Sequence, residues 1–169
     1  KDFKIRTGIS QLNEDLGELK TAYQQATSAL AHGLQINKVN KRKLFFSYPS
    51  GVFNYSDFIK IDMLHLYYKN FGKLPEEFQK LVEIIELDEK EIINNKDYKN
   101  NDSKLLFRYL RNQLRINETA KESYMHRNSL VYRLNRIEEK LGVSLEDEKA
   151  REKIMLTFLI NDYKKAYLN

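Results

Sequence analysis

The spacing of apolar and polar positions divides the chain into a short mixed region and a longer helical region. Residues 3–10, "FKIRTGIS", alternate apolar and polar side chains, as a half-buried strand does. Residues 14–33 instead place apolar side chains on one helical face: Leu16, Leu19, Ala22, Tyr23, Ala26, Ala29 and Leu30. A second apolar run, "KRKLFFSYP" at 41–49, predicts a strand that ends before Pro49. Strand, helix and strand in this order indicate the closing part of a small sheet domain.

The predicted helix at 14–33 has signals at both ends. Asp15 and Glu18 have the spacing of a capping box, in which a side chain at the helix start binds free backbone N–H groups. Gly33 stands where a C-terminal cap belongs, because glycine adopts the left-handed conformation at little cost. Both acids are therefore better explained as caps than as catalytic groups.

From Tyr55 to the end the pattern is helical. One helix starts at Ser56 or Asp57 and stops at Gly72, and the next carries Pro75 in its first turn. Residues 88–102 are polar and rich in asparagine, which predicts a connection between domains. About four helices follow. We therefore predict an α+β chain: a small partial α/β module at 1–72, a connector at 73–102, and an all-α helix-turn-helix domain at 103–169.

Composition sets broad limits on this chain. Of its 169 residues 41% are hydrophobic, enough to form a core, and the mean hydropathy of −0.65 is that of a soluble protein. No apolar run approaches the roughly 18 residues of a membrane span, and no signal peptide is present. Cysteine is absent, which excludes disulfides and thiolate chemistry and fits the cytoplasm. The chain begins with Lys1 rather than Met, as a fragment of a longer protein does.

The net charge is concentrated in one segment. The chain carries a formal charge of +5, and residues 103–141 hold nine bases against four acids, so this segment accounts for the whole excess. The remaining residues balance. A positive excess confined to one segment is typical of a surface that binds a polyanion, although a solvated helix face explains any single arginine equally well.

Residues 118–142, "ETAKESYMHRNSLVYRLNRIEEKLG", have the organisation of a helix-turn-helix. Ala120 is the small residue inside the first helix, the turn falls at 124–126, and Met125 lies beneath it. In the second helix one narrow arc is apolar and must face the core: Leu130, Leu134, Ile137 and Leu141.

The opposite side of this second helix is fixed by the same geometry. Asn128, Tyr132 and Asn135 point outward, and Ser129 and Arg136 lie beside them. Arg127 and Arg133 flank the apolar arc, where we expect them to reach phosphates on either wall of a groove. Glu139 also points outward and would repel a phosphate backbone. We therefore expect the first two turns of the helix to contact DNA.

These residues resemble the C-terminal helix-turn-helix of bacterial purine-catabolism and sugar-diacid regulators. The signature of that family, T-A-x-x-L-x-x-H-R-N-T-L-x-Y-R-L-x-R-I-x-x-x-x-G, is matched at ten fixed positions: His126, Arg127, Asn128, Leu130, Tyr132, Arg133, Leu134, Arg136, Ile137 and Gly142. Ser129 replaces the usual Thr, Ser123 the usual Leu, and Tyr124 stands where many such motifs turn on Gly. Upstream, residues 7–33 resemble, more loosely, the tail of a GGDEF-like domain.

The resemblance implies a sequence-specific DNA-binding transcriptional regulator whose recognition helix, about 127–141, enters the major groove of double-stranded DNA. The expected DNA-contacting residues are His126, Arg127, Asn128, Ser129, Tyr132, Arg133 and Arg136. Such proteins usually bind as homodimers. Apolar side chains on more than one face of the last helix, namely Ile154, Met155, Phe158, Leu159 and Tyr163, offer a dimer surface or a core. We expect a small-molecule effector to act through a region upstream of Lys1, and we expect no cofactor, metal or catalytic residue.

Other functions remain open at this point. The chain could instead be a ligand- or partner-binding signalling module derived from a nucleotide-cyclase-like fold, without catalysis, since no G-G-[DE]-E-F motif occurs and the six glycines are isolated. RNA binding ranks lower, because RNA-binding strand motifs are absent. His32 and His65 have no carboxylate or cysteine partner in sequence, so we expect no metal site. His126 can make a local hydrogen bond or touch DNA, and Tyr132 can pack or touch DNA.

Overall fold

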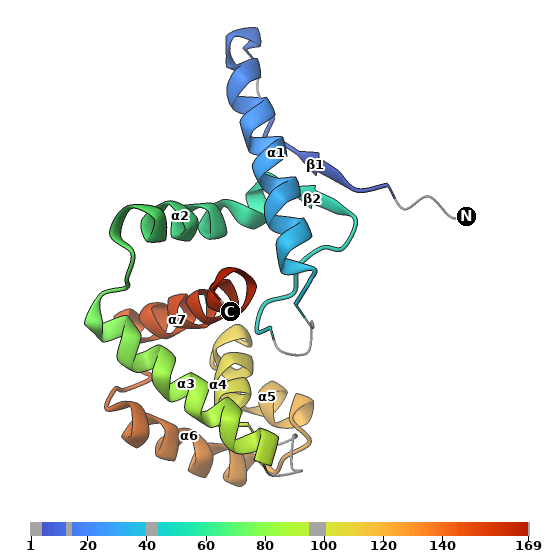
Figure 1. The fold of residues 1–169 in the computed structure, drawn as a ribbon. Helices are drawn as coiled ribbons and strands as arrows, with labels where there is room; N and C mark the ends of the chain where they lie inside the picture. Colours follow the sequence, from blue (N-terminus) through green and yellow to red (C-terminus); the bar gives the residue numbers. More distant parts are fainter. Residues whose placement is uncertain (1–4, 13–14, 40–43, 95–100, 169) are drawn as a thin grey trace. The chain divides into compact units, whose positions relative to one another are not determined.

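The computed structural model describes residues 5–12, 15–39, 44–94 and 101–168 (Figure 1). These residues form two compact units, Lys1–Leu74 with Asp162–Asn169 and Pro75–Asn161. A small parallel sheet precedes a series of helices, so the α+β class is confirmed. The division differs from the predicted segments in two places. Of the predicted connector, the described residues 75–94 and 101–102 belong to the helical unit, and the described residues 162–168 belong to the first unit.

The first unit is built on a strand–helix–strand crossover. It contains β1 (Thr7–Ile9), a 3₁₀ turn η1 (Leu16–Glu18), α1 (Leu19–Ile36), β2 (Val52–Asn54) and α2 (Tyr55–Phe71). The two strands pair in parallel, with Gly8 opposite Phe53. Parallel strands need a long connection, and α1 supplies it. The predicted strand, helix and strand order is thus present, although both strands are only three residues long.

The predicted cap at Gly33 is wrong, because α1 continues past it to Ile36. Gly33 is buried, and a Cβ there would lie 2.2 Å from the ring of Phe53. The glycine therefore permits close packing of α1 on β2 rather than ending the helix. The helix start fits the prediction better, since the carboxylate of Asp15 accepts a hydrogen bond of 2.8 Å from the backbone N–H of Gly17.

No strand forms over the described residues 44–49, where a strand was predicted; residues 41–43 lie outside the described part. The reason is a buried acid. The carboxylate of Asp162 accepts hydrogen bonds from the backbone N–H groups of Phe45, at 2.9 and 3.1 Å, and Phe46, at 2.9 Å. These N–H groups are the ones that a strand would use in its ladder, so the segment is held as a loop and the second strand forms at 52–54 instead.

The apolar face predicted for α1 is covered over only part of its length. Ala29 is fully buried, whereas Leu19 and Tyr23, and Leu16 of η1, are more than 60% exposed. Two strands of three residues are too short to cover a helix of 18 residues. Leu19 and Tyr23, in the N-terminal half of α1, therefore remain in solvent.

The second unit is helical. It contains α3 (Glu76–Asn94), α4 (Asp102–Arg111), α5 (Ile116–Glu122), α6 (Arg127–Leu141) and most of α7 (Glu148–Tyr167). Residues 88–94, predicted as part of a polar connection, continue α3, while 95–100 lie outside the described residues. Each helix contributes buried side chains to one core: Val82, Ile85, Leu105, Leu106, Phe107, Ala120, Leu130, Leu134, Ile137, Ile154, Phe158 and Leu159.

The last helix serves both units. Residues 148–161 belong to the helical unit and 162–167 to the first unit. Ile154, Phe158, Leu159 and Tyr163 are all at most 6% exposed. These four side chains are therefore core residues and offer no dimer surface, whereas Met155, the fifth residue considered for that surface, is only part-buried. Among the described residues, no helix is long and apolar enough to cross a membrane.

Candidate nucleic-acid interface

The turn between α5 and α6, Ser123–His126, has the geometry of a helix-turn-helix. Tyr124 adopts a left-handed conformation, with φ of 54°, which side chains other than glycine rarely take. The backbone N–H of Met125 then donates to the carbonyl of Ala120 at 2.9 Å. Tyr124 thus occupies the position at which many such motifs use glycine, and its ring extends into solvent. Ala120 is 5% exposed, as expected for the small residue at the crossing.

A side chain of α4 and that of its C-cap residue, Asn112, hold α5 and this turn in place. The amide of Asn112 donates to the hydroxyl of Thr119 at 3.3 Å and to the carboxylate of Glu122 at 3.1 Å. The guanidinium of Arg108 donates to the hydroxyl of Ser123 at 2.7 Å. Arg108 therefore belongs to the scaffold, although the charge count of the sequence assigned it to the basic segment.

His126 begins α6 as its N-cap. Its Nδ1 accepts a hydrogen bond of 3.2 Å from the backbone N–H of Asn128, which is one of the free donors at a helix start. The local hydrogen bond considered for this histidine is thus present, and the ring is nevertheless exposed. At the other end, Gly142 takes the left-handed conformation, with φ of 65°, and closes the helix.

The two sides of α6 differ as the spacing predicted. Leu130, Leu134 and Ile137 are buried, whereas Leu141, the fourth residue of the predicted apolar arc, is only part-buried. The side chains at the opposite positions are exposed, and Tyr132 keeps 65% of its surface in solvent. The exposed group comprises His126, Arg127, Asn128, Ser129, Tyr132 and Arg136, which we call the α6 outer row. Six of the seven expected site residues therefore lie together on the accessible side of one helix.

Arg133, the seventh, lies elsewhere. Its Nε donates to the carboxylate of Asp102 at 2.9 Å, and its guanidinium forms an ion pair with the same group. Its side chain is 17% exposed, whereas the expectation was that it flanks the apolar arc and reaches phosphate. Asp102 is the first residue of α4. Asp102 lies at the end of the predicted connector, so no sequence pattern linked it to Arg133.

The charge of the basic segment is partly neutralised within the unit. Among the described residues, at least four of its nine bases have an acidic partner: Arg108 with Glu122, Arg115 with Glu118, Arg133 with Asp102, and Lys140 with Asp88. Within the described part of the chain, Arg127 and Arg136 of α6 have no such partner and are exposed. These two arginines and the positive end of the α6 dipole supply the positive potential of the α6 outer row.

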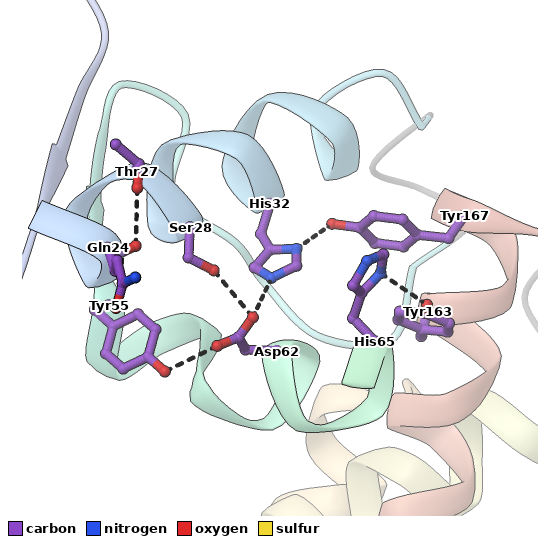
Figure 2. Close-up of polar contacts among 9 residues, drawn as sticks. All are labelled: Gln24, Thr27, Ser28, His32, Tyr55, Asp62, His65, Tyr163 and Tyr167. Atoms are coloured by element: carbon purple, nitrogen blue, oxygen red, sulfur yellow. Dashed lines mark hydrogen bonds and ion pairs between the residues drawn. The ribbon is translucent and has the colours of Figure 1, made fainter. Parts of the chain in front are cut away.

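The first unit contains a separate polar cluster, which Figure 2 shows. His32 of α1 lies 3.0 Å from the carboxylate of Asp62 on α2, which also accepts hydrogen bonds from Ser28 at 3.0 Å and Tyr55 at 2.9 Å. The other nitrogen of His32 accepts from the hydroxyl of Tyr167, at the end of α7. The view that this histidine lacks a carboxylate partner is therefore wrong.

His65 is also part of the cluster. Its ring centroid is 5.8 Å from that of His32, and its Nδ1 accepts from the hydroxyl of Tyr163 at 3.1 Å. The two histidines are 33 positions apart in sequence, and the packing of α1 on α2 brings them together. Burial raises the pKa of Tyr163 and Tyr167, so both hydroxyls stay protonated and serve as donors. In the described part of the chain, no group of three or more His, Cys, Asp or Glu side chains is arranged to hold a metal ion.

Comparisons with known proteins agree with the geometry of the helical unit. The family described as the PucR C-terminal helix-turn-helix domain matches residues 104–160. The purine catabolism regulatory protein of Bacillus subtilis (strain 168) is 46% identical over 48 residues, which are 28% of this chain and 9% of that protein. The chain thus matches only a small part of this relative's length. No solved structure is significantly similar to the chain.

Proposed function

Because the chain carries a helix-turn-helix domain of the PucR C-terminal type, we propose that it is a sequence-specific DNA-binding transcriptional regulator. The relative that matches this domain is, by its name, a regulatory protein. The observation that carries the proposal is the α6 outer row: polar and basic side chains that can read DNA occupy the exposed side of a helix whose other side is buried.

In this proposal α6 enters the major groove with its first two turns. Arg127 and Arg136 neutralise phosphates, which supplies most of the affinity, and Asn128, Ser129 and Tyr132 reach base edges. An asparagine pairs well with adenine, because its amide both donates and accepts. Glu139 is exposed one turn beyond Arg136 and repels phosphate, which favours a tilt of the helix away from the groove there. The mechanism is binding, without a catalytic residue or cofactor.

The remaining features of the protein are part of the same proposal. Residues 1–72 are the tail of a GGDEF-like module, an assignment supported by the parallel β1–α1–β2 crossover. This module transmits the signal of a small-molecule effector bound further upstream. The protein acts as a homodimer in the bacterial cytoplasm, where its double-stranded DNA lies.

Selection from a pool of random double-stranded DNA with the purified chain tests the function. We expect enrichment of a short motif. The control is the variant Arg127→Glu with Arg136→Glu, which keeps the buried side of α6 and reverses the charge of its exposed side. We expect this variant to keep the helical circular-dichroism spectrum and to enrich nothing. If the unchanged chain enriches no motif, the proposed function is wrong.

A further inference from the structure

Two basic residues on α6 each lie within ion-pair distance of an acid, one acid at the start of α4 and the other on α3. Arg133 pairs with Asp102, the first residue of α4. Lys140 Nζ lies 3.9 Å from the carboxylate of Asp88 on α3. Arg133 and Lys140 are seven residues apart, which is two helical turns, so they project from the same side of α6. The two contacts therefore hold α6 at two points along its length.

The acids are themselves fixed. Asp88 is 8% exposed, and its second oxygen accepts a hydrogen bond of 2.9 Å from the backbone N–H of Ser103. The side-chain oxygen of Asn101 accepts a hydrogen bond of 2.9 Å from the backbone N–H of Lys104, the residue after Ser103. The free N–H groups at the start of α4 are thus satisfied from two directions, and negative charge is favourable at this end of the helix dipole. The carboxylate of Asp88 is consequently held in place, and the backbone of Asp102 is placed by the capped start of α4.

We propose that Asp102 and Asp88 act as a two-point clamp that orients α6 for base recognition, and that Arg133 is a positioning residue rather than a phosphate ligand. The proposal rests on the proposed DNA-binding function. A guanidinium held by two of its nitrogens against a carboxylate fixes the rotation of α6 about its axis. The contact of Lys140, which lies two helical turns away, fixes the tilt. Contacts to base edges depend on both the rotation and the tilt of α6, whereas the attraction to phosphates depends chiefly on the charge of the side chains.

The variant Asp102→Asn separates the two roles of Arg133, because they predict effects of opposite sign. The substitution removes a negative charge and releases the guanidinium. If Arg133 is a phosphate ligand in competition with Asp102, DNA affinity rises for every sequence. If Arg133 is a positioning residue, the affinity for the selected site falls while the affinity for unrelated DNA does not.

The experiment measures binding of the full chain to its selected site and to an unrelated duplex over a range of salt concentrations. We expect Asp102→Asn and Arg133→Gln each to weaken specific binding on the order of tenfold. The slope of log K against log salt and the affinity for unrelated DNA should stay as in the unchanged chain for both variants. Arg136→Ala is the matched control, and its slope should change by about 1. Circular dichroism establishes that each variant is folded at the assay temperature.

The clamp is overturned by either of two results. One is a flattened salt slope for Arg133→Gln together with tighter binding by Asp102→Asn, which makes Arg133 a phosphate ligand. The other is specific binding that neither variant alters. If Asp102→Asn does not fold, Lys140→Gln is tested in its place. The Lys140 side chain is 45% exposed, and its loss leaves the start of α4 capped. Specific binding that Lys140→Gln does not change then overturns the clamp. Failure of the proposed function is recognised separately, because the unchanged chain itself then selects no site.

Discussion

The imidazole of His32 lies 3.0 Å from the carboxylate of Asp62, in the interior of the first unit. Burial lowers the pKa of His32 below its ordinary value of 6.5, and the hydrogen bond and charge of Asp62 offset this only in part. Burial would raise the pKa of Asp62 above 3.8, but hydrogen bonds from His32, Tyr55 and Ser28 outweigh it, and the pKa is lowered. At neutral pH the pair is therefore a neutral imidazole that donates to an ionised carboxylate.

This pair makes the stability of the first unit depend on pH. Because the folded state lowers the pKa of His32, the unfolded chain takes up the proton first as pH falls below about 6.5, and unfolding is favoured there. The contribution of His32 is complete above that pH, and that of Asp62 is lost only below about pH 3.8. We expect the melting temperature to fall between about pH 7 and about pH 5, and to fall less in His32→Gln.

Tyr55→Phe is the control for that measurement, since it removes one donor to Asp62 and leaves His32 in place. Its melting temperature should be lower at every pH while the decrease between neutral and acid conditions remains. The melting temperatures are measured by circular dichroism. If they decrease equally with pH in the unchanged chain and in His32→Gln, His32 does not determine the stability in this pH range.

Gly33→Ala should destabilise the protein even though alanine is the better helix former. The new methyl group would lie 2.2 Å from the buried ring of Phe53. Overpacking of this kind costs about 1–3 kcal/mol, against a gain of about 1 kcal/mol in helix propensity. Gly51→Ala is the matched control, because nothing lies within 4 Å of a Cβ there. Denaturant unfolding of both variants tests the expectation, and a Gly33→Ala as stable as Gly51→Ala contradicts it.

Ala120→Leu should separate the two helices of the motif. Ala120 is 5% exposed, and its carbonyl accepts the hydrogen bond that closes the turn at Met125. We expect a loss of about 1–3 kcal/mol in the free energy of unfolding. DNA affinity should also fall, since the bulky side chain displaces α6. Asn117→Leu places the same side chain at an exposed position of the same helix. Equal stability and equal DNA affinity of the two variants would mean that no close crossing exists at Ala120.

Substitutions in the α6 outer row should divide into two kinds. Arg127→Ala and Arg136→Ala are expected to weaken binding to all sequences and to reduce the slope of log K against log salt by about 1 each. Asn128→Ala should leave that slope unchanged and relax the preference at one base pair, at a cost of about 1–3 kcal/mol. Titration of the selected and unrelated duplexes distinguishes the two. A slope that neither arginine variant changes excludes this docking face.

The helical periodicity of α6 was sufficient to predict both of its sides. The arc of Leu130, Leu134 and Ile137 is buried, because a helix fixes the angle between successive side chains regardless of its neighbours. Tyr124 could likewise be assigned to the turn from its place in the motif, and its φ of 54° agrees. Local geometry was enough in these cases, since each relationship spans only a few residues.

Contacts between distant segments could not be predicted in the same way. Arg133 binds Asp102 across 31 positions, and His32 binds Asp62 across 30, so no periodicity links either pair. The loop at Phe45 is held by Asp162, 117 positions away, which overrides a local preference for strand. A partial signal existed for Arg133. Arg133 flanks the buried arc of α6, so its side chain can reach a neighbouring helix. Acids are favourable at the start of a helix, and such an acid is a suitable partner for this arginine.

We expect two copies of the chain to assemble on DNA. The α6 outer row offers only a few side chains to base edges, so one copy reads a few base pairs. Two copies on half-sites one helical turn apart, about 34 Å between centres, would multiply the affinity. Ile154, Phe158, Leu159 and Tyr163 of α7 are buried within one chain, so these four do not supply the dimer contact. We expect light scattering to give two chains per duplex on the selected site, and the site to have two-fold symmetry. Insertion of about five base pairs between the half-sites turns one of them to the opposite face of the duplex and should abolish the joint binding. One chain per duplex on a site without symmetry would exclude the homodimer.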